Sequence, residues 1–249
     1  MKLSVQLYTV RDLMDKDPAG TLASLHKIGL RYVELAGYAG KSAEEFNKMV
    51  KGAGLKVSGM HIGMDAAEKN LPQILDDAAL FGCKHVIVPW AAPGKNKAEW
   101  EALGIKLHAI GEKVAKERHV FGYHNHAHEF AMADGKTGFD IMFSAACPDH
   151  LKCQIDLWWA YVGMGDPAAL VKQYGSRVRC VHLKDGETRK GDAKQMIAGQ
   201  GAMKWEPVIE ACKNAGVEFG SIEFDTCPGP EIECVKASLD FFRSHDLTE

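Results

Sequence analysis

Five histidines and four acidic residues of this 249-residue chain lie at or just past the ends of short runs rich in β-branched and aromatic residues. They are His61, His124, His126, His128 and His182, with Glu34, Glu129, Asp156 and Glu223. A buried carboxylate is costly unless it is paired or bound to a metal. If the four acids meet, they need a common counter-charge, and a divalent cation supplies it.

The kind of ion follows from the kind of ligand. A site made of three of these carboxylates and one of the imidazoles would be hard and oxygen-rich. Such a site favours Mn²⁺, with Mg²⁺, Co²⁺ or Zn²⁺ as alternatives. A structural alternative is that each acid anchors a neighbouring loop or pairs with Lys184 or Arg189.

The elements that must position these residues alternate along the whole chain. The predicted strands are Leu3 to Tyr8, Tyr32 to Leu35, Lys56 to His61, His85 to Trp90, Val120 to His124, Lys152 to Leu157, Val178 to Leu183 and Glu218 to Phe224. The predicted helices lie near 18–28, 42–53, 70–82, 97–118, 138–146, 166–174, 203–215 and 230–244, and Asp-Pro pairs at 17–18 and 166–167 indicate helix starts.

Eight strand-helix units in this length predict an α/β protein with one (β/α)8 barrel, forming a single domain over residues 1–249. An open doubly wound sheet usually has a glycine-rich first turn, which Tyr8-Thr9-Val10-Arg11 does not provide. Active sites of such barrels lie at the carboxyl ends of the strands, where the nine residues above are found. Histidines elsewhere, including His85 at the start of a strand, are expected to be structural.

Bulk composition limits the class of partner. The net charge of −3 and the scattered lysines and arginines disfavour nucleic acid. No apolar run approaches the roughly 18 residues of a membrane span, and residues 1 to 10 predict a strand rather than a signal peptide. We therefore expect a cytoplasmic protein with a small-molecule substrate, an export signal removed before Met1 being the alternative. Seven scattered cysteines favour reduced thiols. A homo-oligomer is possible, since barrels often pair.

Several motifs resemble the xylose isomerase-like barrels, known as sugar phosphate isomerases/epimerases. The resemblance covers nearly the whole chain. Its motifs are Tyr123-His-Asn-His126 with His128-Glu129-Phe130, Gln154-Ile-Asp156-Leu-Trp158 with Gly165-Asp-Pro167, Val181-His-Leu-Lys-Asp185, Gly199-Gln-Gly201 with Trp205, and Ile222-Glu-Phe-Asp225.

The resemblance implies a metal held by one residue from each of the fifth to eighth strands. Three of these ligands are Asp156, His182 and Glu223. Many relatives place the fifth-strand glutamate where this chain has Gly122, so the resemblance points to Glu129 as the fourth ligand. Ketohexose epimerases of the family have a histidine where this chain has Trp159, which argues against that activity.

The implied reaction is isomerisation or epimerisation of a small carbohydrate through a metal-stabilised enediolate. Glu129 and Glu223 are the candidate base and acid, with His126 or His124 as alternatives. A metal-dependent lyase, dehydratase or hydrolase acting on a keto-sugar, keto-glycoside or keto-inositol is the second reading. A sugar-binding barrel without catalysis is the third.

Other residues at the strand ends are expected to contact the substrate. They are Glu34, His61, Trp90, His124, Asn125, Trp158 and Lys184, of which the two tryptophans offer faces that stack on a sugar ring. The Gly199-Gln-Gly201 turn is weak evidence for a phosphate site, and a simple tight turn explains it better.

Overall fold

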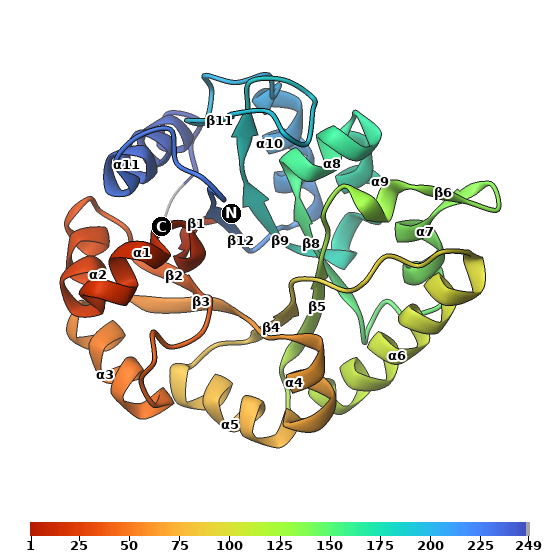
Figure 1. Ribbon diagram of the computed structural model, residues 1–249, viewed down its shortest axis with the longest axis horizontal. Helices are drawn as coiled ribbons and strands as arrows, with labels where there is room; N and C mark the ends of the chain where they lie inside the picture. The colour runs from red at the N-terminus through yellow and green to blue at the C-terminus, as the bar shows by residue number, and fades with distance from the viewer. Residues whose placement is uncertain (248–249) are drawn as a thin grey trace.

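The computed structural model describes residues 1–247 and contains a closed barrel of eight parallel strands in the order β1-β12-β9-β8-β5-β4-β3-β2 (Figure 1). The barrel strands are β1 (Lys2–Gln6), β2 (Tyr32–Leu35), β3 (Lys56–His61), β4 (His85–Val88), β5 (Val120–His124), β8 (Lys152–Asp156), β9 (Val178–Leu183) and β12 (Phe219–Ile222). The predicted (β/α)8 barrel is confirmed, and each predicted strand is present. Some predicted strands are longer than the observed ones. For example, β1 ends at Gln6, because Leu7–Val10 forms a 3-10 helix.

Helices surround the barrel as an outer ring (Figure 1). They are α1 (Arg11–Lys16), α2 (Pro18–Lys27), α3 (Ala43–Gly52), α4 (Met64–Lys69), α5 (Leu71–Phe81), α6 (Lys97–Lys116), α7 (Gly138–Ser144), α8 (Leu157–Met164), α9 (Pro167–Tyr174), α10 (Trp205–Ala215) and α11 (Glu231–Arg243). All eight predicted helices are present. The two Asp-Pro starts are confirmed, since Asp17 and Asp166 accept hydrogen bonds from the N–H groups of Gly20 and Ala169.

Helix α8 was not predicted, and neither were α1, α4 or the hairpins β6–β7 (Met132–Ala133, Lys136–Thr137) and β10–β11 (Asp185–Gly186, Gln195–Met196). The α8 sequence is apolar without helical periodicity, so no amphipathic pattern reveals it. It begins directly after β8, where Oδ1 of Asp156 accepts a hydrogen bond of 2.8 Å from the backbone N–H of Trp159. One oxygen of Asp156 is thus used as a helix cap.

Strand register sets which residues meet at the carboxyl end of the barrel. Asp156 at the end of β8 pairs with His182 on β9, and Gln6 at the end of β1 pairs with Glu34 on β2. Neighbouring parallel strands hold these side chains at one level inside the barrel.

No helix within residues 1–247 is long and apolar enough to cross a membrane. None of the seven cysteines, all within residues 1–247, is in a disulfide bond.

Glycines on α6 allow neighbouring backbone to approach closely. A Cβ atom on Gly111 would lie 1.8 Å from the carbonyl oxygen of His150, and one on Gly104 would lie 2.2 Å from that of Met142. Backbone cannot move aside as a flexible side chain can, so these positions must lack a side chain for α6 to pack against the α7 region.

We predict that Gly111→Ala lowers the free energy of unfolding by about 1–3 kcal/mol through overpacking, although alanine favours helix. The matched control is Gly52→Ala in α3, where a Cβ atom meets nothing within 4 Å. That variant should be neutral or more stable by about 0.5–1 kcal/mol. Urea unfolding of both variants measures the difference, and equal stabilities would contradict the packing explanation.

Candidate active site at the barrel mouth

The strand ends bring together one buried group of potential metal ligands. Ligand atoms of His124, Asp156, His182 and Glu223 all lie within 4.8 Å of one another, and all four residues are buried. A second group, His61, His124 and His182, shares two of these histidines. Three of the four ligands implied by the sequence resemblance are therefore adjacent.

Two buried atoms of the first group accept or donate no hydrogen bond, namely Nδ1 of His124 and Oδ2 of Asp156. The latter lies 3.2 Å from Nζ of Lys184 as an ion pair only. Unsatisfied buried polar atoms are rare, and a cation bound between them would satisfy both. The donor set therefore fits a divalent metal ion, which His124, Asp156, His182 and Glu223 could hold.

Glu129 lies outside both groups. Its Oε1 accepts a hydrogen bond of 2.8 Å from the Tyr123 hydroxyl, and its Oε2 accepts one of 2.8 Å from the backbone N–H of His126. Oε1 also lies 3.2 Å from Nε2 of His128. Both oxygens are thus used by β5 and the loop that follows it, and His124 rather than Glu129 joins the other three residues in the group of potential ligands.

His182 lies between two carboxylates. Its Nε2 is 2.6 Å from Oε2 of Glu34, and its Nδ1 is 2.7 Å from Oε2 of Glu223. Burial disfavours the imidazolium cation, but the two carboxylates outweigh burial and raise the pKa of His182 to about 10.

Lys184 lies fully buried among three carboxylates. Its Nζ is 2.9 Å from Oε2 of Glu223, 2.8 Å from Oδ2 of Asp225 and 3.2 Å from Asp156. Burial alone would lower the pKa of Lys184, but these carboxylates outweigh it and raise that pKa above its usual range. Lys184 therefore carries a permanent charge that balances the acids.

Two further histidines stay neutral. Burial lowers the pKa of His126 to about 4, and its Nδ1 has no hydrogen-bond partner. Burial likewise holds the pKa of His124 well below its usual value. Neutral imidazoles can accept a proton or bind a metal at neutral pH.

A cavity of about 380 Å³ opens above the buried group. Tyr8, His61, Trp90, His124, His126, Glu223 and Asp225 are among its lining residues. Tyr8 and Trp90 are 45% and 52% exposed at the rim, so their rings are available to a ligand.

Four residues expected to contact substrate do not line this cavity, one of them being Lys184, whose surroundings are given above. Trp158 is completely buried, and a Cβ atom on Gly186 would lie 2.4 Å from its Nε1. Asn125 joins β5 to β8 by accepting a hydrogen bond from the N–H of Asp156. Glu34 lies beneath the cavity, hydrogen-bonded to other barrel residues.

Asp225, Gln195 and Tyr8 also belong to the mouth but were not predicted. Gln195 donates to Oδ2 of Asp225 at 2.6 Å, and the backbone N–H of Asp225 donates to Oε1 of Gln195 at 2.7 Å. Asp225 ends the Ile222-Glu-Phe-Asp225 motif, which could have revealed it. Gln195 carries no local sequence signal, because only the folded loop brings it to Asp225.

The Gly199-Gln-Gly201 turn binds a side chain of the protein itself. Oδ2 of Asp185 accepts hydrogen bonds from the N–H groups of Gly199 and Gly201 and from Nε1 of Trp205. These donors are therefore already occupied, which supports the simple-turn interpretation over a phosphate site.

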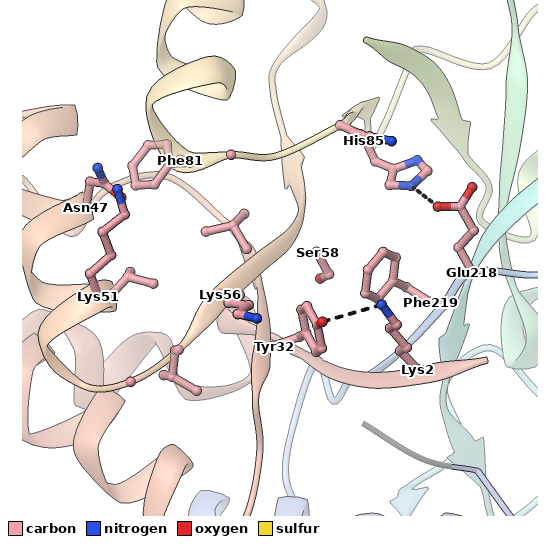
Figure 2. A pocket seen from close by; sticks show the side chains of 16 residues that line it. Lys2, Tyr32, Asn47, Lys51, Lys56, Ser58, Phe81, His85, Glu218 and Phe219 are labelled. Carbon is pink, nitrogen blue, oxygen red and sulfur yellow. Dashed lines mark hydrogen bonds and ion pairs between the residues drawn. The ribbon is translucent and has the colours of Figure 1, made fainter. Parts of the chain in front are cut away.

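A larger cavity, of about 650 Å³, lies at the opposite end of the barrel, where Lys2, Tyr32, Lys56 and His85 begin their strands (Figure 2). His85 lies there, 3.2 Å from Oε2 of Glu218, as expected for a structural histidine. Glu218 is also paired with Arg179. Among residues 1–247, no group of adjacent potential metal ligands lies at this end of the barrel, whereas two such groups lie at the mouth.

Comparison with known proteins agrees with this architecture. Residues 22–245 match the family model of the xylose isomerase-like TIM barrel, so the chain belongs to that family. No curated protein matches the chain.

Solved structures with the same fold include a sugar phosphate isomerase/epimerase from Parabacteroides distasonis, with 22% identity, a TM-score of 0.86 and 97% of each chain covered. The probable 3-DHS dehydratase AsbF from Bacillus anthracis has 14% identity and a TM-score of 0.76, over 98% of this chain and 99% of that one. The IOLI protein with a bound zinc atom has 13% identity and a TM-score of 0.74, over 98% and 97%.

The environment of Glu129 predicts a specific pH dependence of stability. Burial raises the pKa of Glu129 from about 4.5 to about 7. Because the folded state holds this proton more tightly than the unfolded state, the carboxyl group should cost stability progressively as the pH rises from about 4.5 to about 7.

We expect Glu129→Gln to remove this part of the pH dependence. Relative to the unmodified protein, the variant should gain about 1–3 kcal/mol in free energy of unfolding between pH 4.5 and pH 8. Denaturant unfolding of both proteins at these two pH values measures the gain. Parallel stability curves would show that Glu129 is ionised throughout.

Proposed function

We propose that this chain is a divalent-metal-dependent enzyme that isomerises or epimerises a small carbohydrate. The observation that carries the proposal is the buried group of His124, Asp156, His182 and Glu223, with unsatisfied ligand atoms, beneath a cavity at the catalytic end of the barrel. Family membership and the isomerase/epimerase fold neighbour support the substrate class.

The group contains two imidazoles and two carboxylates, so it favours a different ion from the site of three carboxylates and one imidazole expected from the sequence. Imidazole ligands suit Zn²⁺ and Co²⁺ better than Mg²⁺, and Mn²⁺ stays a candidate. The zinc atom in the IOLI structure points the same way. A divalent ion held there would act as a Lewis acid on a carbonyl oxygen and its neighbouring hydroxyl.

The proton on the carbon between those oxygens needs a base, and His126 suits this role best. It lines the cavity and is neutral at pH 7, so its ring can accept a proton there. Glu223 is less suitable, because its Oε2 is already shared by His182 and Lys184. Both oxygens of Glu129 accept hydrogen bonds elsewhere. Returning the proton to the adjacent carbon isomerises the sugar, whereas returning it to the opposite face epimerises it.

Tyr8 and Trp90 complete the proposed substrate site. Their exposed rings at the rim suit the apolar faces of a sugar. Arg11 holds Tyr8 in place, since its guanidinium lies 4.2 Å from the ring centroid and donates to the Tyr8 carbonyl.

A lyase or dehydratase is the second candidate, and one observation favours it. His61 and His126 line the same cavity, and an imidazolium formed by the first proton transfer can then give its proton to a departing oxygen rather than back to carbon. The fold neighbour described as a dehydratase fits this reading.

Metal binding tests the ligand set. Purified protein should contain about one divalent ion per chain, and zinc competition titration should show that Asp156→Asn weakens binding more than about 100-fold, because a direct ligand is lost. Glu129→Gln is the matched control, with binding within about threefold. A chain that binds no divalent ion would overturn the proposed enzyme, and a large loss in Glu129→Gln would restore Glu129 as a ligand.

Proton abstraction tests the reaction. Keto-sugars and keto-glycosides incubated with zinc- or manganese-loaded enzyme in D₂O should gain deuterium next to the carbonyl, as followed by NMR. His126→Gln should slow this exchange by about 10²–10⁴-fold, as expected for loss of a general base. His128→Gln, in the same loop but hydrogen-bonded to the Ala91 carbonyl, is the control.

Loss of a leaving group from the deuterated substrate would select the lyase, while its retention would select the isomerase or epimerase. Exchange that proceeds unchanged in His126→Gln would remove His126 from the mechanism.

A further inference from the structure

We propose that Glu34 is a positioning residue that holds the His182 ring so that Nδ1 faces the other metal ligands. The inference rests on the proposed metal site. It gives Glu34 a role distinct from substrate contact and from direct metal binding, because Glu34 belongs to neither group of adjacent potential ligands.

The two nitrogens of His182 face opposite partners. Nε2 donates to Oε2 of Glu34 at 2.6 Å, while Nδ1 lies 2.7 Å from Oε2 of Glu223, which is itself one of the four grouped residues. A nitrogen that donates its hydrogen to a carboxylate cannot also bind a metal. Nδ1 faces the Glu223 carboxylate in the same way, but Glu223 is itself a potential ligand, so a metal ion held by both residues would replace the hydrogen between them. Glu34 is not a potential ligand, so its bond keeps the hydrogen on Nε2 and leaves Nδ1 for the metal.

Glu34 is itself held by amide donors from two strands. Nε2 of Gln6 on β1 donates to Oε2 at 2.9 Å, and Nε2 of Gln154 on β8 donates to Oε1 at 2.5 Å. The carboxylate is 1% exposed, so water does not compete for these bonds. Gly59 on β3 leaves it little spare room, since a Cβ atom there would lie 3.0 Å from Oε1.

Orientation of Gln154 is fixed as well. Its Oε1 lies 2.7 Å from Nε2 of His61, so its amide nitrogen must point to Glu34. All three partners of Glu34 are therefore hydrogen-bond donors, and only a group that accepts at both oxygens satisfies them. A glutamine at this position would place an N–H₂ group against another donor.

This requirement explains why a carboxylate is buried beneath the site at all. A carboxylate on the second nitrogen of a metal-bound histidine fixes the ring orientation and the tautomer, and losing such a partner typically weakens metal binding about 10–100-fold.

The test compares Glu34→Gln with Glu129→Gln, a buried carboxylate-to-amide change that does not touch His182. Zinc competition titration should show weakening of about 10–100-fold for the first variant and less than about threefold for the second. Far-UV circular dichroism and thermal melting of the metal-free proteins check that both variants fold.

Direct observation of the ring gives a second readout that activity and folding do not affect. In zinc-loaded protein with ¹⁵N-labelled histidine, long-range ¹H–¹⁵N NMR should show His182 with zinc on Nδ1 and hydrogen on Nε2. Zinc on Nε2, or unchanged zinc affinity in Glu34→Gln, would overturn the role of Glu34 while leaving the metal site intact. An unmodified protein that binds no zinc would instead overturn the proposed metal site, and this inference with it.

Discussion

Charge balance inside the barrel mouth is the constraint on which the rest of the site depends. Glu34, Asp156 and Glu223 are buried where water cannot solvate them, and the barrel must supply positive charge to keep them there. Lys184 and protonated His182 provide it without a metal ion, through contacts of 2.6 to 3.2 Å. These contacts hold the carboxylates together, and a divalent cation bound there would take over the counter-charge that protonated His182 supplies.

The loops above the barrel are held by hydrogen bonds that acidic side chains accept from other parts of the protein. Asp185 collects N–H groups of the Gly199-Gln-Gly201 turn, Asp225 is held by Gln195, and Glu129 by Tyr123 and His126. Asp156 differs from these acids, because its buried Oδ2 accepts no hydrogen bond and is left available to a cation.

The two ends of the barrel differ in what their polar groups do. At the amino end, Arg179 neutralises Glu218 as an ion pair and His85 is hydrogen-bonded to it, although the cavity there is the larger of the two. At the carboxyl end, neutral imidazoles with unpaired nitrogens surround a smaller cavity. Buried polar atoms without a hydrogen-bond partner indicate a functional site better than the volume of a cavity does. These atoms favour the mouth as the candidate site.

The sequence by itself determined the barrel, its strand-helix alternation and three members of the buried group of potential ligands, Asp156, His182 and Glu223, because strand ends and local motifs fix which residues reach the mouth. It did not determine α8, whose uniformly apolar sequence lacks a helical period. Tertiary structure alone decided that His124, rather than Glu129, lies in this group and that Glu34 is hydrogen-bonded to His182. Those outcomes depend on hydrogen bonds between strands far apart in the chain, and such pairings leave no periodic or local trace in a single sequence.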